Sequence, residues 1–554
     1  MMAYTFRALE MHGRRMWERA RIVEALDFIV AHDMTALVLH ESDLIQQITF
    51  PSRYFDPYAQ WASAPTRRGE NAIQNNRVYI DHILHLAKSR GVEVWIEVKE
   101  LAFPDEVLEA RPHLIKNGVV CPSDPFWMEF IEHKTAELFD DFPLLAGMIV
   151  SPGSPEGRAS RAQNKCMCEV CARTSLTAWY GGIIAALHRP TARHGKRLAI
   201  RDFAYKPADH EPLIEAIHHA PKDVIFCIKA TPHDFYPTFP DNPAFGRTDR
   251  EQWIEYDTQG QFYGWGILPC FMHEDIVQRL ASAESRGITG GLFRTEWERV
   301  NDWWSLESLN ILNLYTAASY ARGERVSSQA LCRRWLEGHH WPAELAPWLD
   351  SLLSETWPII KHALYIDDFV FADCSMFPRS VGRAWWTMEV KHSLHVWDPA
   401  RLGDLELSQQ RMSDLLTEKA WALQAARQLV ERVETGAPGL PSALHTMLLD
   451  SFKFLVPYVE GLALCADVCL HARWQLTNPH TAIQISLETA IERLRIFGER
   501  LRPLAEEALY PHHITMLLDY KRIEDIAREA ERIMVSAAGT ARMQAAQTAE
   551  ISGS

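Results

Sequence analysis

The chain has 554 residues, with 57 Lys and Arg against 72 Asp and Glu, which gives a formal net charge of −15 at pH 7. Such an acidic chain is an unfavourable partner for nucleic acid, so we expect neither DNA nor RNA binding. Its 47% apolar and 23% charged residues are typical of a globular protein and exclude disordered, collagen-like and small disulfide-stabilised classes. At roughly 100 to 200 residues per domain, the length allows several domains or one large barrel with an appended domain.

The N-terminal residues contain Arg and Glu where a secretory signal peptide needs an uninterrupted apolar stretch. No window approaches the length of uncharged apolar sequence that a membrane-spanning helix requires. The ten cysteines are few for this length, and several lie in apolar strand-like runs, as expected of reduced thiols. We therefore expect a cytoplasmic protein without a membrane partner.

Up to about residue 320, short β-like runs alternate with amphipathic helical stretches such as 21–33 and 77–91. This alternation is typical of βα units. The predicted strands are 5–11, 35–41, 93–99, 145–151, 197–203, 223–229, 264–270 and 290–296. They predict an α/β fold, a (β/α)8 TIM barrel over residues 1–322.

Beyond residue 325 the pattern is helical, with apolar residues recurring at intervals of three and four. The predicted helical stretches are 408–433, 442–470, 480–501 and 512–534. Ser408 and Gly436 stand at the two ends of the first stretch as cap residues. We expect an all-α domain over 323–536, followed by a mobile tail over 537–554. Because helices this apolar must be covered, the helical domain is expected to form a homodimer.

Polar side chains follow the predicted strands. The interior of such a barrel is packed solid, so ligand chemistry is built at the C-terminal strand ends. Carboxylates and bases recur at these ends, namely at Glu10, His12, His40, Glu41, Arg201, Lys229, Arg294 and Glu296. The predicted barrel therefore carries charged groups where a substrate would bind.

Two loops carry the strongest candidates for acid–base chemistry. Glu156 is the only carboxylate of the irregular Pro- and Gly-rich loop VSPGSPEGR, and it is either a catalytic acid or a solvent-exposed side chain. Lys229 closes an apolar strand, and Asp234 follows it. A buried lysine needs an anion, which is either a substrate carboxylate or a neighbouring Asp.

Aromatic residues accompany these charges. Gln261 and Tyr263 lie in a carboxylate- and aromatic-rich segment, and Glu296 with Trp297 is expected to form a wall of the pocket. Aromatic faces beside polar groups suit sugars. Glycoside hydrolysis needs one protonated carboxyl for the leaving oxygen and one carboxylate that activates water or attacks, so this combination fits a glycosidase.

In the order and spacing of its segments, the barrel sequence resembles the bacterial α-glucuronidases that remove glucuronic acid from xylan fragments. The resemblance is carried by residues 19–41, 124–127, 145–157, 198–205, 224–235 and 253–264. It implies an inverting hydrolase of uronic-acid-containing oligosaccharides, with Glu156 as general acid and Asp234 as general base. Arg201 and Lys229 would hold the uronate carboxylate, and catalysis would need no cofactor.

The chain departs from that family at two positions. Gln261 stands where the family has a second catalytic carboxylate, and Ser151 stands where it has a further lysine. Because an amide does not accept a proton at neutral pH, Asp234 would serve alone. Glu10, Glu41 and Glu296 are reserve carboxylates, expected with Gln261, Tyr263 and Trp297 around the substrate.

Three other functions stay open. The same barrel mouth would suit a glycosidase of different specificity, such as a hexosaminidase-like enzyme. Gln261 also fits a non-catalytic, uronate-binding relative. A metal-dependent hydrolase would use His12 and His40 with a strand-end carboxylate, and only this function requires metal at the barrel centre.

Cys166, Cys168 and Cys171 form a CxCxxC cluster shortly after the Glu156 loop. Three thiols at this spacing suit a structural zinc ion whose fourth ligand is Cys121 or a histidine. The other interpretation is a cluster of reduced thiols that packs the loop. A zinc ion here would stiffen the segment that carries Glu156.

Overall fold

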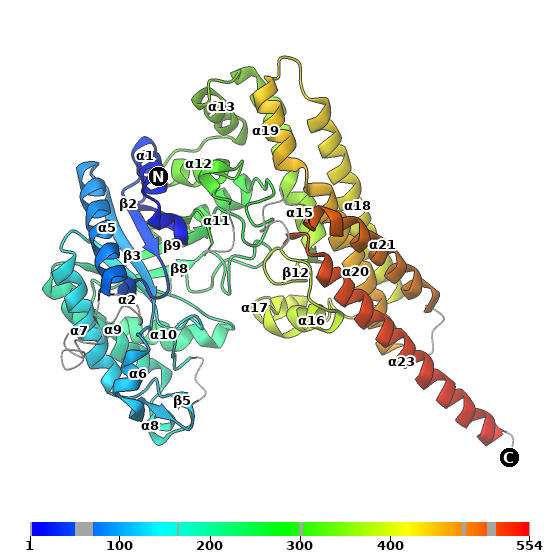
Figure 1. Cartoon of the computed structure of the whole chain (residues 1–554), viewed down its shortest axis with the longest axis horizontal. Coiled ribbons are helices and arrows are strands. Elements are labelled where there is room, and N and C mark those ends of the chain that lie inside the picture. Colours follow the sequence, from blue (N-terminus) through cyan, green and yellow to red (C-terminus); the bar gives the residue numbers. More distant parts are fainter. Residues whose placement is uncertain are drawn as a thin grey trace.

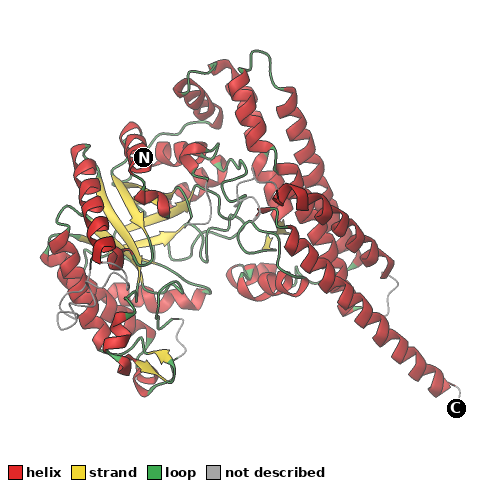
Figure 2. Ribbon diagram, in the orientation of Figure 1, coloured by secondary structure: helices red, strands yellow, loops and turns green. Residues whose placement is uncertain are grey.

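The computed structural model describes residues 3–49, 70–162, 166–297, 303–478, 484–506 and 517–552. Within these residues, eight parallel strands close into a barrel in the order β1-β10-β9-β8-β7-β6-β3-β2. The strands are β1 (Phe6–Met11), β2 (Ala36–His40), β3 (Glu93–Lys99), β6 (Gly147–Ser151), β7 (Arg197–Arg201), β8 (Ile225–Lys229), β9 (Gln252–Asp257) and β10 (Gly290–Arg294). The predicted (β/α)8 barrel is confirmed, and a helical region follows it (Figures 1 and 2).

The seventh strand was predicted at the wrong place. The barrel uses Gln252–Asp257, whereas 264–270 lies in turns beyond it. Gly264, Trp265 and Gly266 have φ angles of 107°, 60° and 69°, which no strand residue adopts. Every residue of β9 is buried, as expected of a parallel strand covered on both faces.

Aromatic rings fill the barrel between its strands. The Phe6 ring stacks on Trp253 at a centroid distance of 3.7 Å, and Trp95 meets Trp253 edge-on at 5.2 Å. Gly147 and Gly290 make room for these rings, because a Cβ atom on either glycine would overlap Trp95 or Trp253. Glycine is therefore required at both positions, because the aromatic rings leave no space for a side chain.

Helices cover the outside of the barrel (Figure 1). They are α1 (Arg19–Ala31), α2 (Leu44–Ile48), α5 (Glu70–Ser89), α7 (Phe126–Asp141), α9 (Leu176–Arg193), α10 (Pro207–His219), α11 (His273–Ser285) and α12 (Ile311–Ala321). Smaller elements decorate the loops, namely η1 (Arg14–Trp17), α6 (Glu106–Ala110), η3 (Pro112–Leu114), β4 (Ile115–Lys116), β5 (Val119–Val120), α8 (Glu169–Arg173) and η4 (Ser305–Glu307). The helices α1 and α5 confirm the predicted stretches 21–33 and 77–91.

The remaining chain is almost entirely helical (Figure 2). It begins with α13 (Ser328–Gly338), η5 (Ala343–Leu345), α14 (Ala346–Leu353), α15 (Thr356–Leu364), the hairpin β11 (Tyr365–Ile366) and β12 (Phe369–Val370), α16 (Val381–Trp386), η6 (Thr387–Lys391), α17 (Leu394–Trp397) and η7 (Pro399–Arg401). The long helices are α18 (Gln409–Thr435), α19 (Ser442–Phe452), α20 (Leu455–Thr477), α21 (Gln484–Glu506) and α23 (Tyr520–Ser552). The Ser408 side chain accepts a hydrogen bond from the Arg411 N–H, and Gly436 ends α18 with a φ of 70°, so both predicted caps are confirmed.

Two stretches of the helical region differ from the simple sequence pattern. Residues 442–470, predicted as one helix, form α19 and α20. The stretch Ser442–Thr477 is long and apolar enough to cross a membrane, but 72% of its most apolar window is buried within the protein, as in a core helix. Helix α23 extends to Ser552 (Figure 1), so most of the expected tail has a helical backbone, and its mobility stays a prediction.

We predict that Gly290→Ala lowers the free energy of unfolding by about 2 kcal/mol, because the new methyl group overlaps the Trp253 ring in a packed layer. Gly181→Ala is the matched control, since a methyl group on Gly181 in α9 would meet no other atom within 4 Å. That control should be neutral or stabilising. Denaturant unfolding of both variants measures the difference, and equal stabilities would contradict the packing argument.

Candidate active site

A hydrogen-bonded line of charged groups runs from the barrel interior to its rim. Glu10 Oε1 lies 2.6 Å from His40 Nδ1, and His40 Nε2 lies 2.7 Å from Lys99 Nζ. Lys99 Nζ then lies 3.0 Å from Glu156 Oε2. Glu10 and His40 are fully buried, whereas the Glu156 side chain is 38% exposed. The predicted acid therefore lies at the outer end of a line that begins inside the barrel.

Burial fixes the protonation state of His40. Burial, followed by the positive charges around it, lowers the pKa of His40 well below its usual value, so the ring is neutral. Since the Lys99 ammonium only donates, His40 Nε2 accepts from Lys99 and Nδ1 donates to Glu10. The two hydrogen bonds of His40 therefore run in one direction, with Lys99 donating to His40 and His40 donating to Glu10.

Arg201 is held mainly by protein carboxylates. Its Nη2 donates to Glu255 Oε1 at 2.7 Å, its Nε donates to the other oxygen of Glu255, and Nε lies 3.2 Å from Glu97 Oε1. Burial raises the pKa of Glu97 to about 7, although Arg201 opposes this shift. Arg201 Nη1 is buried and has no hydrogen-bond partner among the described residues, and its contact with a substrate carboxylate stays a prediction.

Glu10, His12 and His40 have donor atoms within 4.8 Å of one another, which is close enough for a shared metal ion. However, both His40 nitrogens are already engaged, and Arg294 Nη2 lies 2.6 Å from His12 Nδ1. The adjoining Lys99 and Arg294 cations would also repel a divalent ion. This geometry favours an ionic network over the metal-dependent alternative.

Asp234 lies beside the second buried lysine. Lys229 is fully buried, its Nζ donates to the His233 carbonyl at 2.6 Å, and it lies 3.8 Å from Asp234 Oδ1. The Asp234 side chain is 29% exposed. Burial alone would raise the pKa of Asp234, but Lys229 and nearby histidines lower it below the usual value. Asp234 is therefore ionised and accessible, as a base requires.

The two predicted catalytic carboxylates share one electrostatic environment. Lys99 is the main cause that lowers the pKa of Glu156, while the negative charge of Asp234 opposes this shift. Burial raises the pKa of the Tyr205 phenol, and Asp234 and Glu156 add to the shift. Glu156, Asp234 and Tyr205 therefore lie close enough for the charges of the two carboxylates to affect each other and the phenol.

The loop after β8 is held in place by a buried carboxylate. Asp202 accepts a hydrogen bond from the Lys229 backbone N–H at 2.9 Å and from Asn242 Nδ2 at 3.0 Å. The Lys229 ammonium also lies 3.9 Å from the centre of the Phe203 ring. These contacts fix the start of the loop that carries Asp234 and a second point within the loop, at Asn242.

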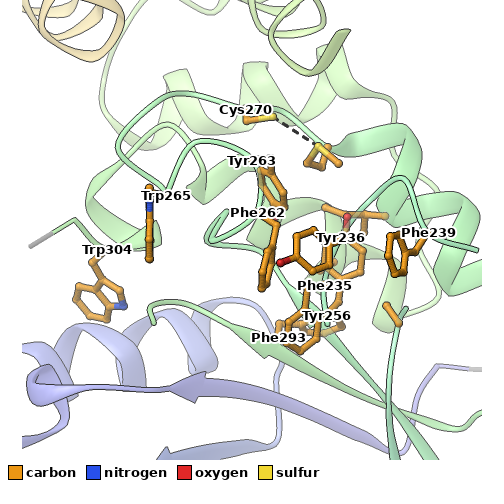
Figure 3. Packing of buried hydrophobic residues seen from close by; sticks show 14 of the residues in the cluster. Phe235, Tyr236, Phe239, Tyr256, Phe262, Tyr263, Trp265, Cys270, Phe293 and Trp304 are labelled. Atoms are coloured by element: carbon orange, nitrogen blue, oxygen red, sulfur yellow. Dashed lines mark hydrogen bonds between the residues drawn. The ribbon is translucent and has the colours of Figure 1, made fainter. Parts of the chain in front are cut away.

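Gln261 joins the barrel rim to the helical region. Its Oε1 accepts from Arg294 Nη1 at 3.2 Å, its Nε2 lies 3.4 Å from Cys374 Sγ, and its carbonyl accepts from Ser375 Oγ at 2.8 Å. The next residue, Phe262, belongs to an aromatic cluster (Figure 3), in which its ring lies 4.3 Å from that of Tyr236 between centroids. The amide thus bridges Arg294 and Cys374.

Two histidines near Asp234 were missed by sequence reasoning. The rings of His233 and His392 lie 4.7 Å apart, and both side chains are buried. His233 Nε2 and His392 Nδ1 lack hydrogen-bond partners among the described residues. His233 adjoins Asp234 in the sequence and could have been chosen, but His392 comes from the helical region, where no motif pointed to it.

The other predicted substrate contacts lie deeper. Glu296 is 1% exposed and lies 2.9 Å from Arg15 Nη1, and burial raises its pKa to about 7. The Tyr263 hydroxyl donates to the Asp257 carbonyl, and Glu10 and Glu41 are buried. Trp297 is half-buried and packs 5.0 Å from the Trp265 ring. Direct contact of these residues with a substrate stays a prediction.

No protein-family model matches the chain, and no curated protein matches it. Among solved structures, the chain is similar to a GH138 enzyme targeting pectin rhamnogalacturonan II, with a TM-score of 0.62 and 12% identity over 95% of this chain. The chain therefore shares the overall fold of that enzyme, a (β/α)8 barrel followed by a helical region. It spans 63% of that enzyme's length, and the match extends through the helical region.

Weaker similarity is found to hexosaminidases. The β-N-acetylhexosaminidase from Bacteroides fragilis matches with a TM-score of 0.39 and 14% identity, over 61% of this chain and 72% of its own. The exo-β-N-acetylglucosaminidase from Vibrio harveyi matches with a TM-score of 0.39 and 13% identity, over 64% of this chain and 58% of its own. The comparisons thus establish the fold, and the substrate must be inferred from the side chains.

We predict that His233 weakens the fold in acid. Burial lowers its pKa to about 3, so between pH 6.5 and pH 3 the unfolded chain binds a proton that the folded chain does not. Stability is therefore lost as the pH falls below 6.5. His233→Gln should lose about 2 kcal/mol less than the wild type between pH 7 and pH 5.

Urea unfolding at the two pH values measures this difference. His85→Gln, a substitution on the exposed face of α5, serves as the control. Identical pH dependence in the wild type and His233→Gln would show that His233 is not held neutral in the folded protein.

Proposed function

We propose that the protein is a glycoside hydrolase that acts on uronic-acid-containing oligosaccharides. The observation that carries this proposal is the pair of accessible carboxylates, Glu156 and Asp234, each beside a buried lysine at the C-terminal rim. Two carboxyl groups are the minimum that glycoside hydrolysis requires. The barrel supplies the C-terminal rim where such sites are built.

The cations of the rim support an anionic substrate. The buried cations Lys99 and Arg201 lower the pKa of Glu156. Lys229 and Arg294, which are also buried, lower the pKa of Asp234. A uronate carboxylate could form charge-assisted hydrogen bonds with these cations, whereas a neutral sugar could not form ion pairs with them. A chain of net charge −15 can therefore bind an acidic sugar through its local positive charge.

In the proposed mechanism, Asp234 removes a proton from a water molecule whose oxygen attacks the anomeric carbon. Glu156 donates a proton to the glycosidic oxygen as the bond from that oxygen to the anomeric carbon breaks. The products are a free uronic acid of inverted configuration and an alcohol, with Asp234 protonated and Glu156 ionised. Proton exchange with water restores both groups.

Substrate binding can prepare Glu156 for this role. In the free protein Lys99 keeps the pKa of Glu156 low, which opposes the protonated state that a general acid needs. A uronate that binds Lys99 would add negative charge beside Glu156 and weaken its ion pair. Both changes raise the pKa of Glu156, so an acidic substrate would help to protonate its own general acid.

The primary test is hydrolysis of α- and β-linked glucuronic and galacturonic acid oligosaccharides, with the product anomer followed by NMR. We expect uronic acid release by the wild type and a loss of about 100-fold or more in Glu156→Gln and Asp234→Asn. Glu215→Gln, an exposed carboxamide substitution on α10, should retain activity. An initially inverted anomer would support the inverting mechanism.

Other outcomes would assign another function. Release of neutral N-acetylated sugars alone would favour the hexosaminidase-like alternative. Uronate binding without turnover would indicate a non-catalytic sugar-binding protein. Full activity in both carboxamide variants would refute the assignment of Glu156 and Asp234.

A second prediction concerns the pH dependence of kcat/KM. Because Lys99 lowers the pKa of Glu156, Lys99→Met should raise that pKa and move the alkaline limb of the profile to higher pH. In Lys99→Met, kcat/KM for a uronoside should also fall more than kcat/KM for a neutral analogue. Lys88→Met, on the exposed side of α5, is the control, and an unmoved alkaline limb would contradict the proposed coupling.

A further inference from the structure

Four cysteines from two loops meet beside the barrel. Cys121 directly follows β5, and Cys166, Cys168 and Cys171 belong to the loop between β6 and α9. Cys121 Sγ lies 3.4 Å from Cys168 Sγ and 3.6 Å from Cys171 Sγ. All four sulfur atoms lie within 4.8 Å of one another. The fold therefore adds Cys121 to the three thiols that are close in the sequence.

The thiols pack mainly against one another. Cys121, Cys166 and Cys171 are the buried members of a separate small cluster, with Val119 and Cys168 packed at its edge. By contrast, the buried cysteines Cys227 and Cys465 pack among the side chains of the larger apolar clusters. Buried thiols that act only as small apolar groups gain their stability from aliphatic and aromatic neighbours. Such neighbours are scarce here, so apolar packing does not explain this cluster.

The backbone around the sulfur atoms is shaped for coordination. Asn117 and Gly118, with φ angles of 53° and 79°, form the tight turn between β4 and β5 that brings Cys121 to the cluster. The Cys171 N–H lies 3.5 Å from Cys168 Sγ, and Cys171 Sγ lies 3.4 Å from Ser123 Oγ. The backbone N–H that points at Cys168 Sγ stabilises the thiolate form that binds metal, whereas the Cys171 thiol itself donates to Ser123 Oγ.

We infer that Cys121, Cys166, Cys168 and Cys171 bind one structural zinc ion. A tetrahedral site with Zn–S bonds of about 2.3 Å has sulfur–sulfur separations of about 3.8 Å, close to the two separations measured between the thiols. Binding forms four Zn–S bonds and releases the four thiol protons to solvent, with no change of oxidation state. With four protein ligands the coordination shell is closed, so the ion is structural.

The zinc ion would join the two loops next to the proposed acid. Leu101 N–H donates to the Ala159 carbonyl at 3.0 Å, and Arg158 N–H donates to the Leu101 carbonyl at 2.8 Å. Arg161 Nη2 donates to the Cys171 carbonyl at 2.9 Å. The loop that carries Glu156 is thus paired with the chain after β3, and β5 and α8 lie side by side at the far end (Figure 1). A zinc ion bound to all four thiols would link the two segments at that end.

Metal analysis of the purified full chain tests the site without reference to activity. We expect about one zinc ion per chain in the wild type, and its loss in Cys121→Ser and Cys168→Ser. Cys332→Ala, which alters a buried cysteine of α13, should retain zinc. Retention of zinc by both serine variants would overturn the assignment, as would a wild-type protein that contains iron instead.

A measurement on the wild type covers the case in which the serine variants fail to fold. Replacement of the bound ion by cobalt(II) should produce the intense visible bands of a tetrahedral tetrathiolate. Zinc should leave the protein as a mercurial reagent titrates about four thiols. A metal-free wild type that forms no such cobalt complex, or a disulfide found between these cysteines by mass spectrometry, would refute the zinc site.

Hydrogen exchange tests the role proposed for the ion. Removal of zinc should accelerate amide exchange in 152–162 and 115–121, whereas exchange in α18 should stay unchanged. Unaltered exchange in both loops would refute the stiffening role. Because metal content and exchange are both independent of turnover, this inference can fail or succeed separately from the proposed glycosidase function.

Discussion

The need to pair buried charges governs the centre of this barrel. Arg201, Glu255 and Glu97 come from three strand ends and are almost completely buried, so each must find its partner within the barrel. The bidentate contact of Arg201 with Glu255 satisfies most of the guanidinium. The same network includes Lys99 through His40, so the position and charge of Glu156 depend on groups buried inside the barrel.

The site is built in two levels as a result. The lower level is the ionic network, in which burial keeps His40 neutral and raises the pKa of Glu97. The upper level contains Glu156 and Asp234, whose carboxylates reach solvent while their lysine partners stay buried. This arrangement offers accessible negative charge for acid–base chemistry without exposing the cations that hold it.

The amino-acid sequence correctly predicted those features that depend on a local pattern of residues. Seven of the predicted strands overlap barrel strands, and the caps Ser408 and Gly436 were recognised because each acts within one helix end. The strand at 264–270 was misplaced because an apolar run resembles a strand until the positive φ angles at Trp265 and its neighbours are known. Contacts between distant segments arise only from the tertiary fold. Cys121 could be named from the sequence only as one of several candidate partners of the thiol cluster, and the contact of His233 with His392 was not predicted.

The junction at Gln261 also limits how the chain can be divided. Tyr365 and Ser375 donate hydrogen bonds to backbone carbonyls of the β9 loop, and Thr356 accepts one from the Phe271 N–H. A fragment that ended near residue 322 would lose all three hydrogen bonds, together with the side chains that cover these backbone groups. The helical region thus completes the barrel rim, and a gene fragment that encodes only the barrel would specify a rim without the contacts that hold its β9 loop.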